Sequence, residues 1–364
     1  MAYSSYITTR SGLRIGQGQP CFIVAEVGNN HQGEMDHARR MVEEAARAGV
    51  QAVKFQKRHL ESLLTRTGRE APYCGVNSFG PTYGAHRLAL ELDAQQMGEL
   101  KLLAESLGLV FFASAWDEVS LDEMLALDVE ILKVCSADLV NVPLMRRVAE
   151  TRLPIILSTG MSSLDEIDAA VALIRTYHNE LVLLHCNSSY PCLEEQIGLP
   201  VMDTLRERYQ LPVGYSGHER GLAPSVASVA LGACVVERHF TLDKNQVGTD
   251  HQASLEPAEL ALLVRMVREV EQSMVQKGKK VFPEELAAAK KLRKCLVFSR
   301  DLPAGHVLVS ADLTTRSPLD GISPVHWDEV LGAVLLRPVK HEEPLQWETL
   351  SARGAGAKTA SSST

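Results

Sequence analysis

Eight short apolar segments, most followed by a polar loop and an amphipathic helical pattern, dominate residues 21–275. Most lack strict apolar–polar alternation, as expected of parallel strands that are covered on both faces. Eight such units predict a (β/α)₈ TIM barrel. A doubly wound open sheet is the alternative, although no G-x-G-x-x-G pattern follows the first segment. The segments begin at Cys21, Val50, Leu109, Glu130, Leu153, Leu181, Leu211 and Ala233.

The pattern changes near Lys277. A Lys-Gly-Lys-Lys run and Pro283 indicate a linker, and the apolar runs after Cys295 are shorter and separated by turn sequences. Short strands with frequent turns predict a small β-rich domain. The last residues are low in complexity and predict a disordered tail. The predicted organisation is a barrel domain over 1–276, a linker over 277–290, a β-rich domain over 291–352 and a tail over 353–364.

Composition narrows the class of protein. A formal net charge of −8 argues against nucleic acid or an anionic membrane as the main partner, but not against a small anionic substrate. No apolar run approaches the roughly 20 residues of a membrane span, and the N-terminal residues lack a signal-peptide core. The seven cysteines show no C-x-x-C spacing, and Cys21, Cys135, Cys186 and Cys234 lie in apolar runs. We therefore expect buried, reduced thiols in a cytoplasmic protein.

The polar residues gather where the predicted strands end. In a TIM barrel these ends meet at one face and form the active site. The set predicted there is Glu26, Asn29, Asn30, His31, Lys54, Gln56, Lys57, Ser114, Lys133, Ser136, Asp138, Ser158, Thr159, His185, Ser188, Tyr190, Ser216, His218, Glu237, Arg238 and His239, with Asp250 further on.

Three groups follow from this set. His218 and His239 end adjacent strands, so their imidazoles suit one Mn²⁺, Mg²⁺ or Zn²⁺ ion; the alternative is two hydrogen-bonded loop histidines. Lys54 and Lys133 point into the mouth and suit a phosphate or carboxylate, unless ion pairs to Glu26 or Asp138 neutralise them. Serine hydroxyls add donors to this anion site. A polyol would suit a third group, namely Glu26, Gln56, Tyr190, Asp250 and Asp138.

The segments that carry these residues resemble the sialic acid (nonulosonic acid) synthases. The resemblance runs in the family's order over nearly all of residues 20–275, and residues 285–350 resemble the antifreeze-like (SAF) domain of these enzymes. The matching stretches are IVAEVGNNHQG from Ile23, AVKFQK from Ala52, LKVCSAD from Leu132, PIILSTGM from Pro154, LLHCNSSYP from Leu183, GYSGHERG from Gly214, VVERHFTLDK from Val235 and GTDHQASLEP from Gly248.

The resemblance implies a domain-swapped homodimer that condenses phosphoenolpyruvate with N-acetylmannosamine, its 6-phosphate or a related amino sugar. The alternative within the same chemistry is another aldose, a mannose-type or diacetamido sugar. It implies Mn²⁺ or Mg²⁺ on His218 and His239, and a cap arginine, matched best by Arg316, at the sugar's acyl group. Sugar-side positions match Glu26, Gln56, Tyr190 and Asp250. The phosphoenolpyruvate-binding positions match Lys54, Ser114, Lys133, Ser136, Ser158, Ser188 and Ser216.

The chain also departs from the family's pattern. Cys135 stands where a glycine is usual, Asp138 where many bacterial members have glutamate, and Ser188 where bacterial members often have asparagine. The stretch GPTYGAHRLALELD from Gly80 resembles the animal-type branch, whose acceptor is a 6-phosphate sugar.

The expected mechanism uses Lys54 and Lys133 to position phosphoenolpyruvate and Glu26 to orient or deprotonate a water molecule. Two other readings remain open at the level of sequence. A Schiff-base aldolase could use Lys54 or Lys133 on the same barrel. A carbohydrate- or ice-binding protein could be built around the C-terminal domain.

Overall fold

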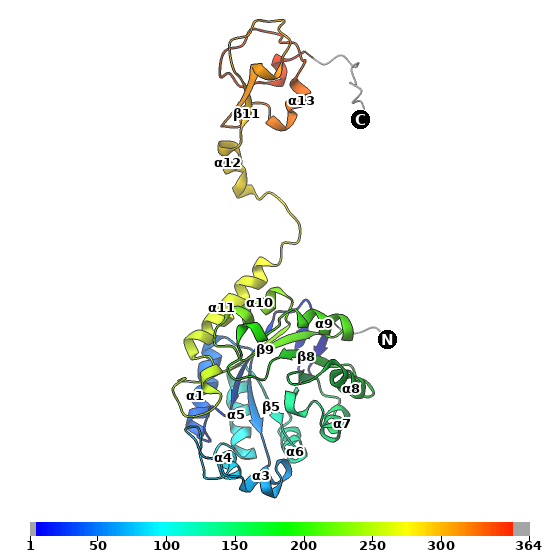
Figure 1. The fold of residues 1–364 in the computed structure, drawn as a ribbon, viewed down its shortest axis with the longest axis vertical. Helices are drawn as coiled ribbons and strands as arrows, with labels where there is room; N and C mark the ends of the chain where they lie inside the picture. The colour runs from blue at the N-terminus through cyan, green and yellow to red at the C-terminus, as the bar shows by residue number, and fades with distance from the viewer. Residues whose placement is uncertain (1–4, 352–364) are drawn as a thin grey trace. The chain divides into compact units, whose positions relative to one another are not determined.

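The computed structural model describes residues 5–351 of the chain (Figure 1). These residues form two compact units, which divide between Val275 and Gln276. The disordered tail predicted over 353–364 lies outside the described residues. No helix within 5–351 has both the length and the apolar character that crossing a membrane requires.

The first unit is a closed barrel of eight parallel strands, and each of the eight predicted segments supplies one of them. The first and last strands pair in register from Val235 opposite Phe22 to His239 opposite Glu26, which excludes the open sheet. The strands are β3 (Phe22–Gly28), β4 (Ala52–Lys57), β5 (Val110–Ala115), β6 (Leu132–Val134), β7 (Ile155–Ser158), β8 (Leu181–Cys186), β9 (Val213–Gly217) and β10 (Val235–His239).

Amphipathic helices surround the barrel and bury their apolar faces against it (Figure 1). Helix α8 buries Ile167, Ala170, Val171 and Ile174, which is the face that its periodicity predicts. The helices of this layer are α1 (Met35–Ala48), α5 (Ala94–Ser106), α6 (Glu118–Ala126), α7 (Val142–Glu150), α8 (Leu164–Arg175), α9 (Val201–Tyr209), α10 (Ala223–Ala230) and α11 (Pro257–Ser273).

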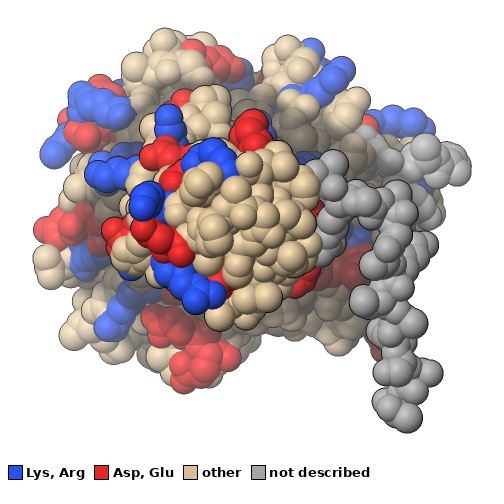
Figure 2. Space-filling view, turned by 90° about the horizontal axis from the view of Figure 1, so that it is seen from above, with Lys and Arg blue, Asp and Glu red and all other residues tan. Residues whose placement is uncertain are grey.

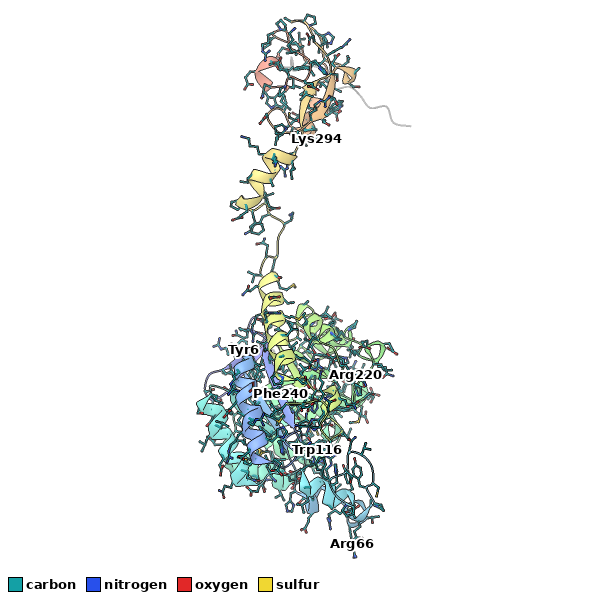
Figure 3. All side chains as sticks on the ribbon, turned by 90° about the vertical axis from the view of Figure 1, so that its left-hand side faces the viewer. Tyr6, Arg66, Trp116, Arg220, Phe240 and Lys294 are labelled. Carbon is teal, nitrogen blue, oxygen red and sulfur yellow. The ribbon has the colours of Figure 1, made fainter. Side chains whose placement is uncertain are left out.

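An antiparallel hairpin of β1 (Tyr6–Thr8) and β2 (Arg14–Gly16) closes one end of the barrel. Its Ile7 and Ile15 are fully buried and pack among inward-facing residues of the barrel strands. Figure 3 shows Tyr6 of this hairpin and Arg66 at opposite ends of the unit. The sequence did not reveal the hairpin, because its strands are short and only one residue of each is apolar and inward-facing.

The glycines and prolines between Lys57 and Gln95 predict a long loop with a late helix for this segment. It contains instead the short helices α2 (Leu60–Leu63), α3 (Arg66–Glu70) and α4 (Tyr83–Ala89) before α5 begins. Threonine hydroxyls cap two of them: Thr65 accepts from the Gly68 amide at 3.1 Å, and Thr82 accepts from the Ala85 amide at 3.2 Å.

The second unit is small and has its own apolar core, which includes Leu296, Phe298 and Leu335. Helix α12 (Pro283–Leu292) occupies part of the region expected to be a linker. Strands β11 (Cys295–Phe298) and β12 (Leu313–Arg316) then pair antiparallel, and α13 (Trp327–Val330) follows. Basic and acidic side chains are interspersed on the face shown in Figure 2, so that face carries no single-sign patch.

All seven cysteines lie in the described part of the chain, and all are free. Cys21, Cys186 and Cys234 are buried as expected. Cys135 is only partly buried, because its strand end opens toward the mouth of the barrel.

His31 gives the barrel unit a predictable sensitivity to acid. The ring lies 5.9 Å from that of Phe55 and is almost fully buried, and Nδ1 accepts from the Gly33 amide at 3.0 Å. Burial lowers the pKa of His31 to about 3. Below about pH 6.5, His31 therefore binds a proton in the unfolded chain but not in the folded protein.

We expect this difference to remove about 2 kcal/mol of folding free energy between pH 7 and pH 5. Urea unfolding of His31→Asn, whose side chain can still accept from Gly33, should show a pH dependence that is weaker by this amount. An identical pH dependence in variant and wild type would contradict the assignment.

Candidate active site

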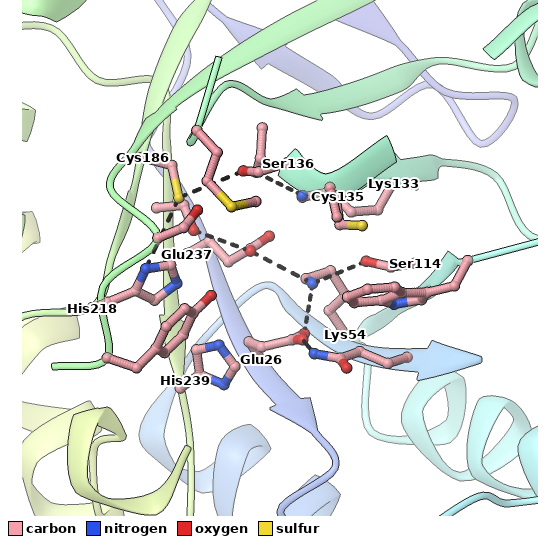
Figure 4. Close-up of a pocket in the computed structure, with 18 residues that line it drawn as sticks. Glu26, Lys54, Ser114, Lys133, Cys135, Ser136, Cys186, His218, Glu237 and His239 are labelled. Atoms are coloured by element: carbon pink, nitrogen blue, oxygen red, sulfur yellow. Dashed lines mark hydrogen bonds and ion pairs between the residues drawn. The ribbon is translucent and has the colours of Figure 1, made fainter. Parts of the chain in front are cut away.

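A cavity of about 210 Å³ opens at the carboxyl ends of the barrel strands (Figure 4). Every strand of the barrel contributes to it, because inward-facing side chains recur at every second residue, as with Glu237 and His239 of β10. The lining residues are Glu26, Lys54, Gln56, Ser114, Trp116, Lys133, Cys135, Ser136, Ala137, Ser158, Met161, Cys186, Ser188, Tyr190, Ser216, His218, Glu237 and His239.

All but three of the predicted substrate, metal and catalytic residues line this cavity. Asp138 lies behind the wall, where it accepts hydrogen bonds from Asn141 Nδ2 and Cys135 Sγ, each at 3.1 Å. Asp250 lies in an adjoining recess, with its Oδ2 atom 4.0 Å from His239 Nδ1. Arg316 belongs to β12 of the second unit, where it pairs with Glu342 at 3.1 Å.

Lys54 is a buried ammonium group whose charge is matched by carboxylates. Its Nζ atom lies 2.8 Å from Glu26 Oε2 and 3.5 Å from Glu237 Oε1, and it donates to Ser114 Oγ at 3.3 Å. Burial opposes its charge, but Glu237 and Glu26 outweigh burial and raise the pKa of Lys54. The ion pair with Glu26 that the sequence left as an alternative to an anion site therefore exists.

Lys133 differs, because no carboxylate of the described residues lies within 4.0 Å of it. Its Nζ atom donates to Ser158 Oγ at 2.7 Å and to the Val134 carbonyl at 3.1 Å. Burial lowers its pKa, and the more distant charge of Glu237 opposes that effect. A buried ammonium group with only neutral partners is costly, so an anion in the cavity would stabilise it.

Hydroxyl and amide groups surround the same region. The Gly160 amide donates to Ser136 Oγ at 3.0 Å. A Cβ atom at position 160 would lie 2.4 Å from Ser188 Oγ and 2.9 Å from Ser136 Oγ, so any side chain there would displace these hydroxyls. The predicted serines at or just beyond the ends of β6, β7 and β8 are thus gathered on one side of the cavity.

The two predicted metal-binding histidines face each other. Their ring centroids are 5.4 Å apart, and Tyr190 lies 3.9 Å from the ring of His218. His218 Nδ1 is 2.6 Å from the Asn187 carbonyl, which fixes Nδ1 as the donor and leaves the Nε2 lone pair available. Burial and the neighbouring His239 lower the pKa of His218 to about 3, so this ring is neutral at physiological pH.

These histidines fit an open metal site rather than a closed one. His239 Nδ1 is buried and has no hydrogen-bond partner among the described residues. Within residues 5–351, no three His, Cys, Asp or Glu side chains converge as a ligand set. The two imidazoles would therefore supply only part of a coordination sphere, and water or substrate oxygens would have to supply the rest.

A chain of hydrogen bonds orients the carboxylate of Glu26. Gln56 Nε2 donates to Glu26 Oε1 at 2.8 Å, and Arg58 donates to Gln56 Oε1. The Arg58 guanidinium lies over the Trp116 ring at 4.2 Å. Arg58 and Trp116 were not predicted as site residues, although each directly follows a barrel strand, β4 and β5 respectively.

Glu237 belongs to the set of polar residues predicted at the strand ends, but no catalytic, substrate-binding or metal-binding role was predicted for it. Its Oε1 atom accepts from Ser216 at 3.2 Å, and its Oε2 atom is buried without a hydrogen-bond partner among the described residues. Burial opposes its charge, but Lys54 and Lys133 keep its pKa below the ordinary value. The sequence did hold a signal, since Glu237 and His239 are two residues apart on one strand and so share a face.

Comparison with family models identifies both units. The NeuB family model matches residues 41–279, and the SAF domain model matches residues 293–351. The first match covers more than half of the chain.

Individual relatives agree with this assignment. The N-acetylneuraminate-9-phosphate synthase of Homo sapiens is 39% identical over 350 residues, which cover 96% of this chain and 98% of the human protein. The N,N'-diacetyllegionaminic acid synthase of Legionella pneumophila is 36% identical over 343 residues, covering 93% and 96% of the two chains.

A solved structure supports the same conclusion. The N-acetylneuraminic acid (sialic acid) synthetase of Leptospira borgpetersenii serovar Hardjo-bovis superposes with a TM-score of 0.68 at 33% identity, covering 79% of this chain and 96% of that one. The chain therefore belongs to the NeuB family and is an enzyme of the sialic and nonulosonic acid synthase type, with a SAF domain after its barrel.

Proposed function

We propose that this enzyme condenses phosphoenolpyruvate with N-acetylmannosamine or its 6-phosphate and water, and releases a sialic acid and phosphate. The observation that carries the proposal is Lys133, a buried ammonium group with no carboxylate of the described residues within 4.0 Å, in the same cavity as His218 and His239. An anionic substrate would complete one side of the cavity, and a metal-activated aldehyde would suit the other.

Phosphoenolpyruvate would lie between Lys54 and Lys133, with its phosphate and carboxylate groups toward the two ammonium groups. Ser136, Ser158 and Ser188 surround Lys133 and Gly160, so their hydroxyls can donate to the same oxygens. Ser114 accepts a hydrogen bond from Lys54, and Ser216 donates one to Glu237. These two hydroxyls therefore lie on the side of the cavity that holds the carboxylates. The effect of this set is mainly to position and orient the substrate.

His218 and His239 would hold the divalent ion, for which we propose Mn²⁺ or Mg²⁺. When bound, such an ion supplies Lewis-acid polarisation of the sugar's aldehyde group. Asn187 holds His218 in the tautomer that can bind a metal.

The bond-forming step would join the methylene carbon of phosphoenolpyruvate to C1 of the open-chain sugar. Water then adds to C2 of the enolpyruvyl unit, and loss of phosphate leaves the ketone. Glu26 is the proposed base, because it lies in the cavity beside Lys54 and Gln56 fixes its orientation. Lys54 would also offset the negative charge of the departing phosphate.

Tyr190 and Asp250 would anchor the sugar. Arg87 would bind a phosphate group on that sugar, if the sugar is phosphorylated. Arg87 lines the recess that contains Asp250 and is partly buried. Its Nε atom donates to Tyr83 at 3.0 Å, and no carboxylate of the described residues lies within 4.0 Å of it. A partly buried guanidinium group without a carboxylate partner favours a sugar acceptor that carries a phosphate at its far end.

We further propose a cytoplasmic, domain-swapped homodimer in which the SAF domain of one chain caps the barrel of the other. In this arrangement Arg316 would reach the acyl group of the sugar, and Asp138 would act from behind the wall through Cys135. The seven free cysteines and the acidic net charge are consistent with a cytoplasmic enzyme that binds no nucleic acid.

The first test is release of phosphate from phosphoenolpyruvate with Mn²⁺ and each candidate sugar. Wild-type enzyme should release phosphate only when an acceptor is present, and His218→Ala and His239→Ala should each lose turnover by at least about a thousandfold while staying folded. His178→Ala, which alters a partly buried histidine outside the cavity, is the matched control and should remain active. Substantial turnover by either metal-site variant with added Mn²⁺ would refute the metal pair.

Lys133→Met should raise the KM for phosphoenolpyruvate about 10- to 100-fold, because one charge-assisted hydrogen bond is lost. Lys57→Met removes another buried lysine, which pairs with Glu123 at 3.3 Å and does not line the cavity, so its KM should change little. An unchanged KM in the Lys133 variant would remove this residue from the anion site. Trapping of a ketone on Lys133 by borohydride would instead support the aldolase alternative.

Arg87→Gln should discriminate between the acceptors. If the phosphorylated sugar is the substrate, its KM should rise about 10- to 100-fold in this variant, whereas the KM for N-acetylmannosamine should stay near the wild-type value. Arg66→Gln, at an exposed arginine paired with Glu70, is the control. Equal effects on the two sugars would refute a role for Arg87 in binding the phosphate.

A further inference from the structure

We propose that Arg238 and Glu219 act as positioning residues that set the separation of the two metal-binding histidines. Each is the sequence neighbour of one of those histidines, Glu219 after His218 and Arg238 before His239. The inference rests on the proposed function, because it assumes that the histidine pair holds a metal ion.

The backbone ladder alone does not fix this separation. Strands β9 and β10 pair at Tyr215 with Val236, at Ser216 with Glu237 and at Gly217 with Arg238. The pairing ends there, so His218 already lies in the loop beyond the ladder, whereas His239 still pairs with Glu26 of β3. Some other contact must hold the loop of His218 against β10.

The Arg238 side chain makes that contact. Its NH1 group donates to Glu219 Oε1, to the Gly221 carbonyl and to Ser225 Oγ, each at 2.9 Å. Its NH2 group donates to the Glu219 carbonyl. One guanidinium group on β10 therefore binds the loop of residues 218–221 at two kinds of acceptor, the backbone carbonyls of the loop and the carboxylate of Glu219.

The Glu219 carboxylate accepts hydrogen bonds from several side chains. Its Oε2 atom accepts from the Tyr215 hydroxyl at 2.8 Å, and its Oε1 atom accepts from Ser225 Oγ at 2.6 Å as well as from Arg238. Both ion-pair side chains are 0% exposed. The pair thus links β9, β10 and the first turns of α10 in a region from which water is excluded.

The local backbone is shaped to admit this carboxylate. A Cβ atom at position 217 would lie 2.4 Å from Glu219 Oε2 and 2.7 Å from Tyr215 Cε1. Only glycine at this position lets the Glu219 side chain fold back beneath the strand end.

The pair lies outside the cavity and cannot contact substrate. Glu237 and His239 face the barrel interior, so Arg238 between them faces the opposite side, toward α10. Neither Arg238 nor Glu219 lines the cavity. A fully buried ion pair is seldom worth more than apolar packing of the same volume, so we infer that this one is retained for the geometry it imposes.

The test is the affinity for Mn²⁺ alone, measured without substrates by the loss of the free-ion paramagnetic resonance signal. Arg238→Lys keeps the charge but loses the fork whose two nitrogens hold the carboxylate and the backbone carbonyl of Glu219. We expect Mn²⁺ to bind about 10- to 100-fold more weakly, as for other residues that orient metal ligands. Binding of phosphoenolpyruvate, measured separately, should stay within about twofold, and excess Mn²⁺ should recover much of kcat.

Two further variants guard against a loss of folding. Glu219→Gln keeps the shape of the side chain, and Ser225→Ala removes only one hydroxyl shared by the pair. Both should weaken Mn²⁺ binding, the second less than the first. Arg268→Lys is the matched control, because this arginine holds the Cys21 carbonyl and Gln51 at the opposite ends of β3 and β4. It should lower stability without changing Mn²⁺ affinity.

Wild-type Mn²⁺ affinity in folded Arg238→Lys and Glu219→Gln, together with lost affinity in His218→Ala, would overturn this inference and leave the proposed function standing. Wild-type Mn²⁺ affinity in His218→Ala would overturn the proposed metal site, and this inference with it.

Discussion

Closure of the barrel between β10 and β3 is the constraint on which the site depends. The pairing that places His239 opposite Glu26 also brings Glu237 within reach of Lys54 across the interior. Residues from the first and last thirds of the barrel sequence thus become neighbours in the barrel interior, where the Lys54 and Glu26 side chains are almost fully buried. In that space each charge needs a partner, and the arrangement of partners decides what the cavity can bind.

The charges are paired unequally, and this inequality is what supports the proposed anion site. Lys54 has two carboxylate partners, whereas Lys133 has a hydroxyl and a carbonyl as its nearest ones. Glu237 lies between the two lysines and is kept ionised by both. The cavity can therefore accept negative charge beside Lys133 without breaking the ion pairs that hold Glu26 in place.

At the lysines and carboxylates the buried side chains are charged, whereas at the histidines burial favours the uncharged form. It keeps His218 neutral, which is the protonation state that a metal ion requires, and Asn187 selects the tautomer. The ladder stops one residue short of His218, so the position of this ring depends on the fully buried pair of Arg238 and Glu219 behind it. The chemistry inside the barrel and the packing outside it are thereby joined through adjacent residues of the same strands.

The sequence alone determined the eight strands, their parallel order and the face on which their polar ends gather, because strand and helix periodicity and the polarity of strand ends are local properties. It also placed most of the cavity-lining residues, such as Lys133 and His218, at that face. It could not separate the roles of Lys54 and Lys133, assign a role to Glu237, or show that Asp138 lies behind the wall. It also missed the hairpin of Ile7 and Ile15. Those features depend on which side chains meet across a closed barrel, and only the tertiary structure decides that, because the partners are brought together by packing between residues far apart in the chain.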